Sequence, residues 1–126
     1  MHRLIQGAVL SAILCSAAAA AQAGGVAFQN ELAVCVTVKA VKTVTETNVV
    51  SVSTSFQLHK SIGDCGCYSA LATYKSSVDL GGVREVLQEG VITIKNDGTK
   101  TLVLASEPAL IANRKIQVQL TCAPPA

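Results

Sequence analysis

Tryptophan is absent from this 126-residue chain, and aromatic residues of any kind make up only 3% of it. Sugar-binding surfaces built on stacked aromatic rings are therefore disfavoured. Charged residues are also few, at 14%, and the ten Lys and Arg residues are scattered along the chain instead of clustered. Nucleic-acid binding needs a concentrated basic face, so we expect no nucleic-acid partner.

Long hydrophobic runs are confined to the start of the chain. A short basic start, an apolar run and an alanine-rich end are the pattern of a secretory signal peptide over residues 1–23. Polar residues interrupt the run, which makes it a poor transmembrane helix. A bacterial lipoprotein has a small residue immediately before its lipid-modified cysteine, whereas Leu14 occupies that position before Cys15. We therefore expect Cys15 to carry no lipid and to be removed with the signal peptide. The mature domain, residues 24–126, is expected to be periplasmic or secreted, without membrane contact after cleavage.

Residue types that carry catalysis are equally sparse. His59 is the only histidine after residue 23, and its position at the end of a strand-like run suggests a surface side chain. Glu85 and Glu89 are four apart in a strand-like stretch, which does not pair them for acid–base work. Three serines fall at a period of two with no nucleophile motif: Ser51, Ser53 and Ser55. We expect no enzyme, no catalytic residue and no cofactor.

The rest of the chain has enough valine, leucine and isoleucine to bury a core, and its apolar residues alternate with polar ones at the period of two that marks β-strands. The cleanest alternation runs over residues 49–59. Residues 68–75 could also form a helix, but the alternation of their side chains favours a strand. Residues 24–31 are expected to be coil. The predicted strands are 32–45, 49–59, 67–80, 83–88, 91–95, 101–105 and 115–122.

Turn signals separate these segments. Gly81-Gly82 predicts one hairpin, and Asn96-Asp97-Gly98 predicts another that joins strands 91–95 and 101–105. Gly90 predicts a bulge or corner, and residues 106–113 predict a loop with one helical turn. About seven short strands without a long helix predict a single immunoglobulin-like β-sandwich domain. The missing tryptophan and the cysteine spacing exclude an antibody-type domain.

Four cysteines remain after the signal: Cys35, Cys65, Cys67 and Cys122. An even number in an exported chain predicts two disulfides. A bridge between Cys65 and Cys67 would close a small, strained ring. We therefore expect each of these two to pair outward, one with Cys35 and the other with Cys122. The sequence leaves open which pairs with which.

Three blocks carry a resemblance to a known family: residues 33–38, 64–74 and 120–125, which read AVCVTV, DCGCYSALATY and LTCAPP. They resemble a family of small exported bacterial proteins catalogued as a domain of unknown function. The Cys-Gly-Cys block is the most specific part, and the resemblance covers nearly all of the mature chain. It implies no activity.

Two function classes follow. The leading hypothesis is a monomeric, non-enzymatic accessory domain of the periplasm that binds another exported protein through an edge strand. Fimbrial subunits lack one strand and receive it from a neighbouring subunit. The last strand predicted here is complete, which favours a self-contained monomer over a fimbrial subunit. The alternative is a thiol-based site, in which Cys65 and Cys67 hold a soft metal such as Cu(I) or Zn(II), or carry electrons. His59 would be the additional metal ligand.

Overall fold

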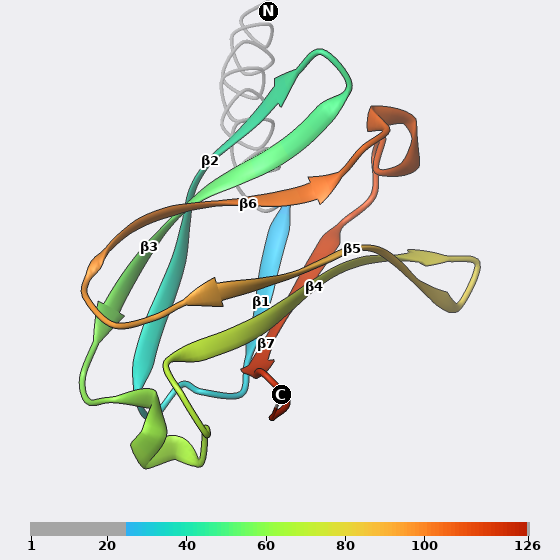
Figure 1. Ribbon diagram of the computed structural model, residues 1–126. Coiled ribbons are helices and arrows are strands. Elements are labelled where there is room, and N and C mark those ends of the chain that lie inside the picture. The colour runs from blue at the N-terminus through green and yellow to red at the C-terminus, as the bar shows by residue number, and fades with distance from the viewer. Residues whose placement is uncertain (1–24, 126) are drawn as a thin grey trace, which may run out of the picture.

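The structure, a computed structural model, describes residues 25–125 (Figure 1). The predicted signal peptide lies outside these residues. None of the helices that they form is long and apolar enough to cross a membrane. The elements, in chain order, are β1 (Val26–Asn30), β2 (Val36–Glu46), β3 (Val49–Leu58), the 3-10 helix η1 (Ile62–Cys65), β4 (Leu71–Leu80), β5 (Val83–Thr93), β6 (Gly98–Ala105), the 3-10 helix η2 (Pro108–Leu110) and β7 (Ile116–Cys122).

The seven strands of the described part form two sheets, so the all-β prediction is confirmed. One sheet has the order β1-β7-β4-β5 and the other the order β2-β3-β6. Neighbouring strands are antiparallel except β1 and β7, which run parallel. The four-plus-three division is that of an immunoglobulin constant-type sandwich. The strand order differs, because in that fold the first two strands share a sheet.

The core lies between the sheets and is built from alternating residues. On β3 the predicted inward face is buried, from Val50 through Thr54 to Phe56, while the serines between them point outward. On β7 the same alternation buries Ile116, Val118 and Leu120, as predicted. Burying such side chains removes apolar surface from water, which is the main force that holds the two sheets face to face.

Side chains of β4 also bind the backbone of β6 across the sandwich. The Tyr74 hydroxyl donates to the carbonyl oxygen of Val103 at 3.0 Å and accepts from its amide at 3.1 Å. The Ser76 hydroxyl donates to the Leu104 carbonyl. Tyr74 thus supplies an edge strand with the hydrogen bonds that a neighbouring strand would make. Burial raises the pKa of Tyr74 above its ordinary value of 10.0, and the hydrogen bond to Val103 partly opposes this.

Two predictions at the start of the domain were wrong. Residues expected to be coil include β1, which is only five residues long and half-buried at alternate positions. The strand expected from residue 32 begins at Val36, because a turn precedes it. The Asn30 side chain accepts from the Leu32 amide at 2.9 Å, and the Leu32 carbonyl then accepts from Cys35 and Val36. Val34, expected within the strand, lies in the segment that follows this Asx turn and is 70% exposed.

The middle of the chain needs three further corrections. The strand expected from Cys67 begins at Leu71, and Tyr68, which was expected to lie on the same strand face as Tyr74, precedes the strand and is 79% exposed. The strands predicted on either side of Gly90 are one strand, β5, and its bulge lies at Leu87. The turn at residues 96–98 is present but does not make a hairpin, because β5 pairs with β4 and β6 pairs with β3. The chain crosses between sheets there.

The remaining predictions for local structure are confirmed. The Gly81-Gly82 turn joins β4 and β5, which pair from Leu80 and Val83 onward. Both glycines have positive φ, 61° and 91°, which favours glycine at these positions. The predicted helical turn in the loop after β6 is η2. The strand alternative was right for residues 71–75, which belong to β4.

We expect Gly90→Ala to lower the free energy of unfolding by about 1–3 kcal/mol, the usual cost of overpacking a core. A Cβ atom at Gly90 would lie 2.7 Å from Cε1 of Tyr74, whose ring is held by its hydroxyl at Val103. Gly98→Ala is the matched control, since a Cβ atom there meets nothing within 4 Å. Urea unfolding measures both. Equal losses in the two variants would contradict this account of Gly90.

We expect Tyr74→Phe to cost about 1–2 kcal/mol, because the amide and carbonyl of Val103 lose their partner. The raised pKa of Tyr74 also predicts a pH dependence. Above about pH 10 the unfolded chain releases the tyrosine proton before the folded chain does, so wild-type stability falls as pH rises. Urea unfolding between about pH 8 and 11 should show a smaller alkaline loss in the variant. Parallel losses in both proteins would refute this role.

Candidate functional site

The Cys-Gly-Cys segment follows the short helix η1. The Ser61 hydroxyl accepts from the Gly63 amide at 3.2 Å and caps this helix, and the buried Ile62 anchors it in the core. Gly66 then adopts a φ of 98°, in the left-handed region that favours glycine. The chain therefore reverses between Cys65 and Cys67, and the two side chains reach different partners.

The two bridges are Cys35–Cys65 and Cys67–Cys122. Cys35 directly precedes β2 in the three-stranded sheet, and Cys122 ends β7 in the four-stranded sheet. The outward pairing predicted from the sequence is confirmed, and the structure fixes which cysteine pairs with which. Residues 65–67 are thereby bonded covalently to both sheets at the same end of the molecule. We call this three-residue segment the disulfide clasp.

His59 lies close to the clasp but is not directed at its sulfur atoms. Its backbone amide donates to the Cys35 carbonyl at 2.7 Å, while its exposed ring nitrogen Nε2 lies 2.6 Å from the Thr37 hydroxyl. Within residues 25–125 no group of three or more His, Cys, Asp or Glu side chains is placed to hold a metal ion. With Cys65 and Cys67 both oxidised, a thiol-based site would require both bridges to open.

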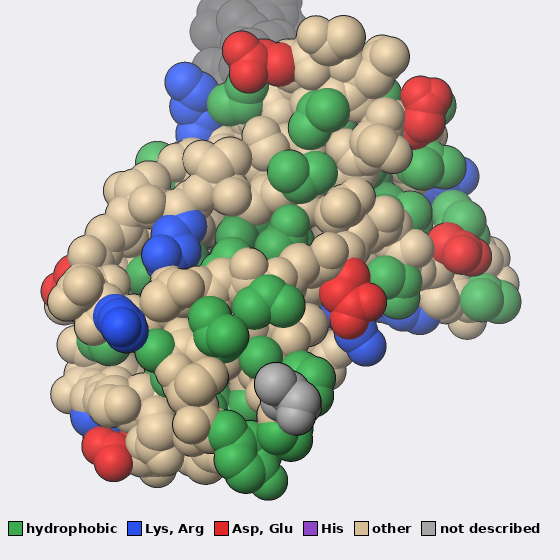
Figure 2. Space-filling view, in the orientation of Figure 1, with side chains coloured by type: hydrophobic (Ala, Val, Ile, Leu, Met, Phe, Trp, Pro, Cys, Tyr) green, Lys and Arg blue, Asp and Glu red, His purple; other side chains and the backbone are tan. Residues whose placement is uncertain are grey.

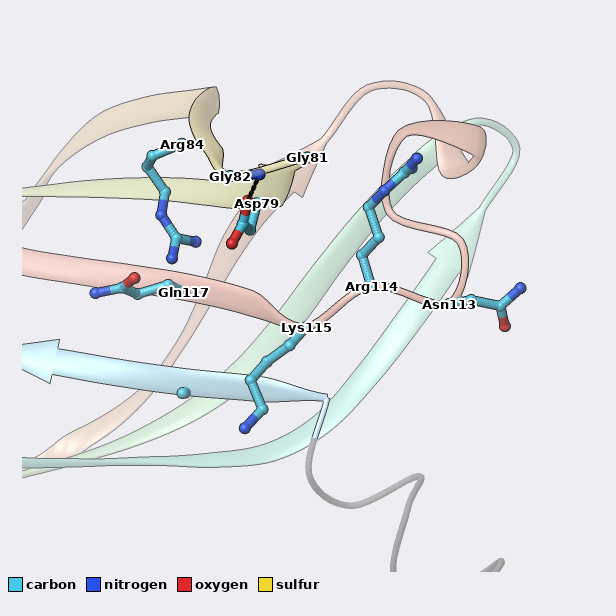
Figure 3. A pocket seen from close by; sticks show the side chains of 9 residues that line it. Asp79, Gly81, Gly82, Arg84, Asn113, Arg114, Lys115 and Gln117 are labelled. Atoms are coloured by element: carbon cyan, nitrogen blue, oxygen red, sulfur yellow. Dashed lines mark hydrogen bonds between the residues drawn. The ribbon is translucent and has the colours of Figure 1, made fainter.

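A second candidate site is a pocket of about 600 Å³ at the opposite end of β4 and β7. Its walls are the β4–β5 turn at Gly81-Gly82 and the segment that leads into β7 (Figure 3). Sequence analysis did not find this pocket, because its residues come from three separate parts of the chain. The lining residues are Ala27, Asp79, Gly81, Gly82, Arg84, Asn113, Arg114, Lys115 and Gln117.

Hydrogen bonds fix the walls of this pocket. Asp79 accepts from the Gly82 amide at 2.8 Å, which closes the β4–β5 turn. Arg114 donates through Nη1 to the Leu110 carbonyl at 3.1 Å, which holds its side chain against the η2 loop. On the floor, the Gln117 amide group donates to the Gln29 side chain and links β7 to β1. The pocket is therefore framed by a turn, a loop and two paired strands.

The fold and the clasp define a two-sheet, all-β domain with two disulfide bonds. The chain belongs to the family described as "Uncharacterized protein conserved in bacteria (DUF2195)", whose model matches residues 9–125. The resemblance drawn from the sequence to a bacterial family of unknown function is confirmed at this level. No curated protein and no solved structure matches the chain.

We expect removal of either bridge, by Cys35→Ala/Cys65→Ala or Cys67→Ala/Cys122→Ala, to cost about 2–5 kcal/mol of unfolding free energy. The second pair should cost about 0.5 kcal/mol more in the chain-entropy model, because it closes a separation of 55 residues against 30. Urea unfolding provides the comparison. Alkylation of the purified wild type without reduction should label none of these four cysteines, and a labelled Cys65 or Cys67 would contradict the structural role of the clasp.

Proposed function

We propose that this protein is a non-enzymatic, exported accessory domain that binds another exported protein along the edge strand β5. The observation that carries the proposal is the exposure of β5. It is eleven residues long, pairs only with β4, and bears three exposed valines: Val83, Val86 and Val91. An edge strand of this kind can accept an extended segment of a partner through main-chain hydrogen bonds, with side-chain contacts adding specificity.

The other edge strands are less suited to this role. Strand β1 has only five residues, and the backbone of β6 is bound by Tyr74 and Ser76. Strand β2 matches β5 in length but carries the exposed residues Lys39 and Lys42 on either side of its bulge. Lysines on an edge oppose pairing with another chain. Among the four edges, β5 therefore combines a length of eleven residues with the largest number of exposed valines.

Apolar exposure continues from β5 onto its neighbour. Leu71 on β4 is 41% exposed and lies opposite Thr93, two positions beyond the Thr73–Val91 pair. Tyr68, just before β4, is the most exposed of the large hydrophobic residues. Figure 2 shows hydrophobic side chains distributed along this side of the molecule, from its lower end to the hairpin tip at the right. Tyrosine and apolar residues on a rigid surface favour protein binding over catalysis.

Two further observations support an exported, non-catalytic role. Both disulfides suit an oxidising compartment, the periplasm or the exterior. The residues that could have suggested hydrolysis are dispersed, since Ser51, Ser53 and Ser55 lie along β3 while the His59 ring contacts Thr37. A partner that covers β5 leaves the domain otherwise self-contained, in agreement with a monomer as its free state.

The test is a double substitution, Val86→Lys/Val91→Lys, which places two charges beside the β5 edge. Partners captured by crosslinking in intact cells are identified by mass spectrometry, and their affinity for the purified protein is then measured. We expect the variant to bind the partner at least about tenfold more weakly, because each lysine must be desolvated or displaced.

The matched control is Val41→Lys/Val49→Lys, on the β2–β3 hairpin, where the two valines are 64% and 41% exposed. This variant should bind like the wild type and unfold at the same urea concentration as the β5 variant. Loss of binding in the control alone, or equal binding by all three proteins, would overturn the assignment to β5. Sedimentation velocity checks whether the partner is a second copy, and we expect a monomer.

A further inference from the structure

The pocket at the end of the molecule away from the clasp has an uneven charge. Three of the four charged side chains that line it are cationic, Arg84, Arg114 and Lys115, and the fourth is Asp79. Over the whole chain the balance is ten basic residues to eight acidic ones. The pocket therefore gathers positive charge that the sequence distributes sparsely elsewhere, although these residues come from two separate segments.

The one carboxylate in the pocket is already engaged. Asp79 binds the Gly82 amide, so its negative charge is partly balanced by the turn that it closes. Figure 3 shows Arg84 extending from β5 toward Gln117, and Lys115 extending from the start of β7 across β1, away from Arg84. Arg114 is held on the η2 loop by the Leu110 carbonyl, and Figure 3 shows its side chain pointing away from Arg84 and Lys115. Two cationic side chains thus flank the cavity from opposite walls.

The shape of the pocket allows a ligand of useful size. Its volume of about 600 Å³ lies within the usual range of small-molecule sites. Gly81 and Gly82 form one wall without side chains, and a Cβ atom at either position would meet nothing within 4 Å. The positive φ of both disfavours larger residues there, so the wall stays open. Ala27 contributes only a methyl group to the floor.

We propose that this pocket binds a small organic acid through its carboxylate or phosphate group, with Arg84 and Lys115 as the principal ligands. The planar guanidinium of arginine presents paired donors that match either group, and the lysine ammonium adds a point charge. Gln117 on the floor provides a polar group for the remainder of the ligand. The proposal rests on the pocket and its charge, and is independent of partner binding at β5.

The experiment uses the mature protein labelled with ¹⁵N and titrated at constant ionic strength with citrate, glycerol phosphate and inorganic phosphate. We expect saturable amide shifts centred on the β4–β5 turn and the start of β7 for at least one of the three. Chloride at matched ionic strength is the reference. Shifts that grow linearly for every anion, without saturation, would overturn the proposal.

Three variants connect binding to the named groups. Arg84→Gln/Lys115→Gln should weaken binding about tenfold or more, since charge-assisted hydrogen bonds are lost. Asp79→Asn keeps an oxygen acceptor for Gly82 and removes the opposing charge, so it should strengthen binding several-fold. Lys75→Gln, on the same sheet face but outside the pocket lining, should leave affinity unchanged. Equal weakening by the Lys75 and Arg84/Lys115 variants would show general charge attraction and refute the site.

A phosphate group can also belong to a lipid headgroup, and vesicles distinguish the two sources. Cosedimentation with phosphatidylglycerol vesicles, with phosphatidylcholine vesicles as the control, is measured for the wild type and the Arg84→Gln/Lys115→Gln variant. We expect neither protein to sediment with either kind of vesicle, because the proposed ligand is a soluble acid. Sedimentation with the anionic vesicles that the variant abolishes, together with no response to the soluble acids, would overturn the small-molecule assignment.

Discussion

The disulfide clasp is the constraint on which the rest of this structure depends. One bridge leaves Cys65 toward the three-stranded sheet and the other leaves Cys67 toward the four-stranded sheet. In a domain of about 100 residues, packing alone leaves a modest margin of stability. Covalent links that close separations of 30 and 55 residues restrict the unfolded chain and raise that margin. Gly66 allows the two bridges to leave in different directions, because its left-handed conformation turns Cys65 and Cys67, on either side of it, away from each other.

Away from the clasp, the sandwich is closed by polar side chains buried between the sheets. Tyr74 and Ser76 reach from β4 to the backbone of β6, and Gly90 on β5 leaves room for the tyrosine ring. These contacts satisfy an edge strand that would otherwise present unpaired backbone groups. The β5 edge receives no such cover from β4 side chains. This difference between the covered edge of β6 and the open edge of β5 is one reason that we assign partner binding to β5.

The sequence was sufficient to predict structure wherever one strand follows the period-two rule over many residues. β3 and β7 were predicted almost to the residue, because one face of each is buried by the opposite sheet. β1 was missed, since five residues carry too little alternation and its partner, β7, lies at the far end of the chain. The Asn96-Asp97-Gly98 turn was read as a hairpin because turn chemistry specifies a reversal of the chain. It does not specify whether the next strand joins the same sheet.

The same distinction explains which parts of the site could be predicted. The outward pairing of the cysteines followed from ring strain, a local property of Cys65 and Cys67. Assigning each to its partner required the sheet arrangement, because Cys35 and Cys122 belong to different sheets. The pocket could not be predicted for a related reason: Arg84 and Lys115 are 31 positions apart in the sequence and line one pocket only when β4 pairs with both β5 and β7.

The two proposed binding surfaces differ in how they lie relative to the clasp: the pocket is at the opposite end of β4, and the β5 surface runs along the whole strand. The two disulfides join the chain at the clasp, while the β4–β5 hairpin projects at the right of Figure 1, at the other end of β4, with exposed residues on both strands. Segments with fewer buried contacts open at lower free-energy cost, and binding elements are drawn from them. A domain fixed covalently at one end can present adaptable residues at the other without loss of its core. The pocket and two of the exposed valines, Val83 and Val86, lie on or beside this hairpin, whereas Val91 pairs with Thr73, nearer the clasp.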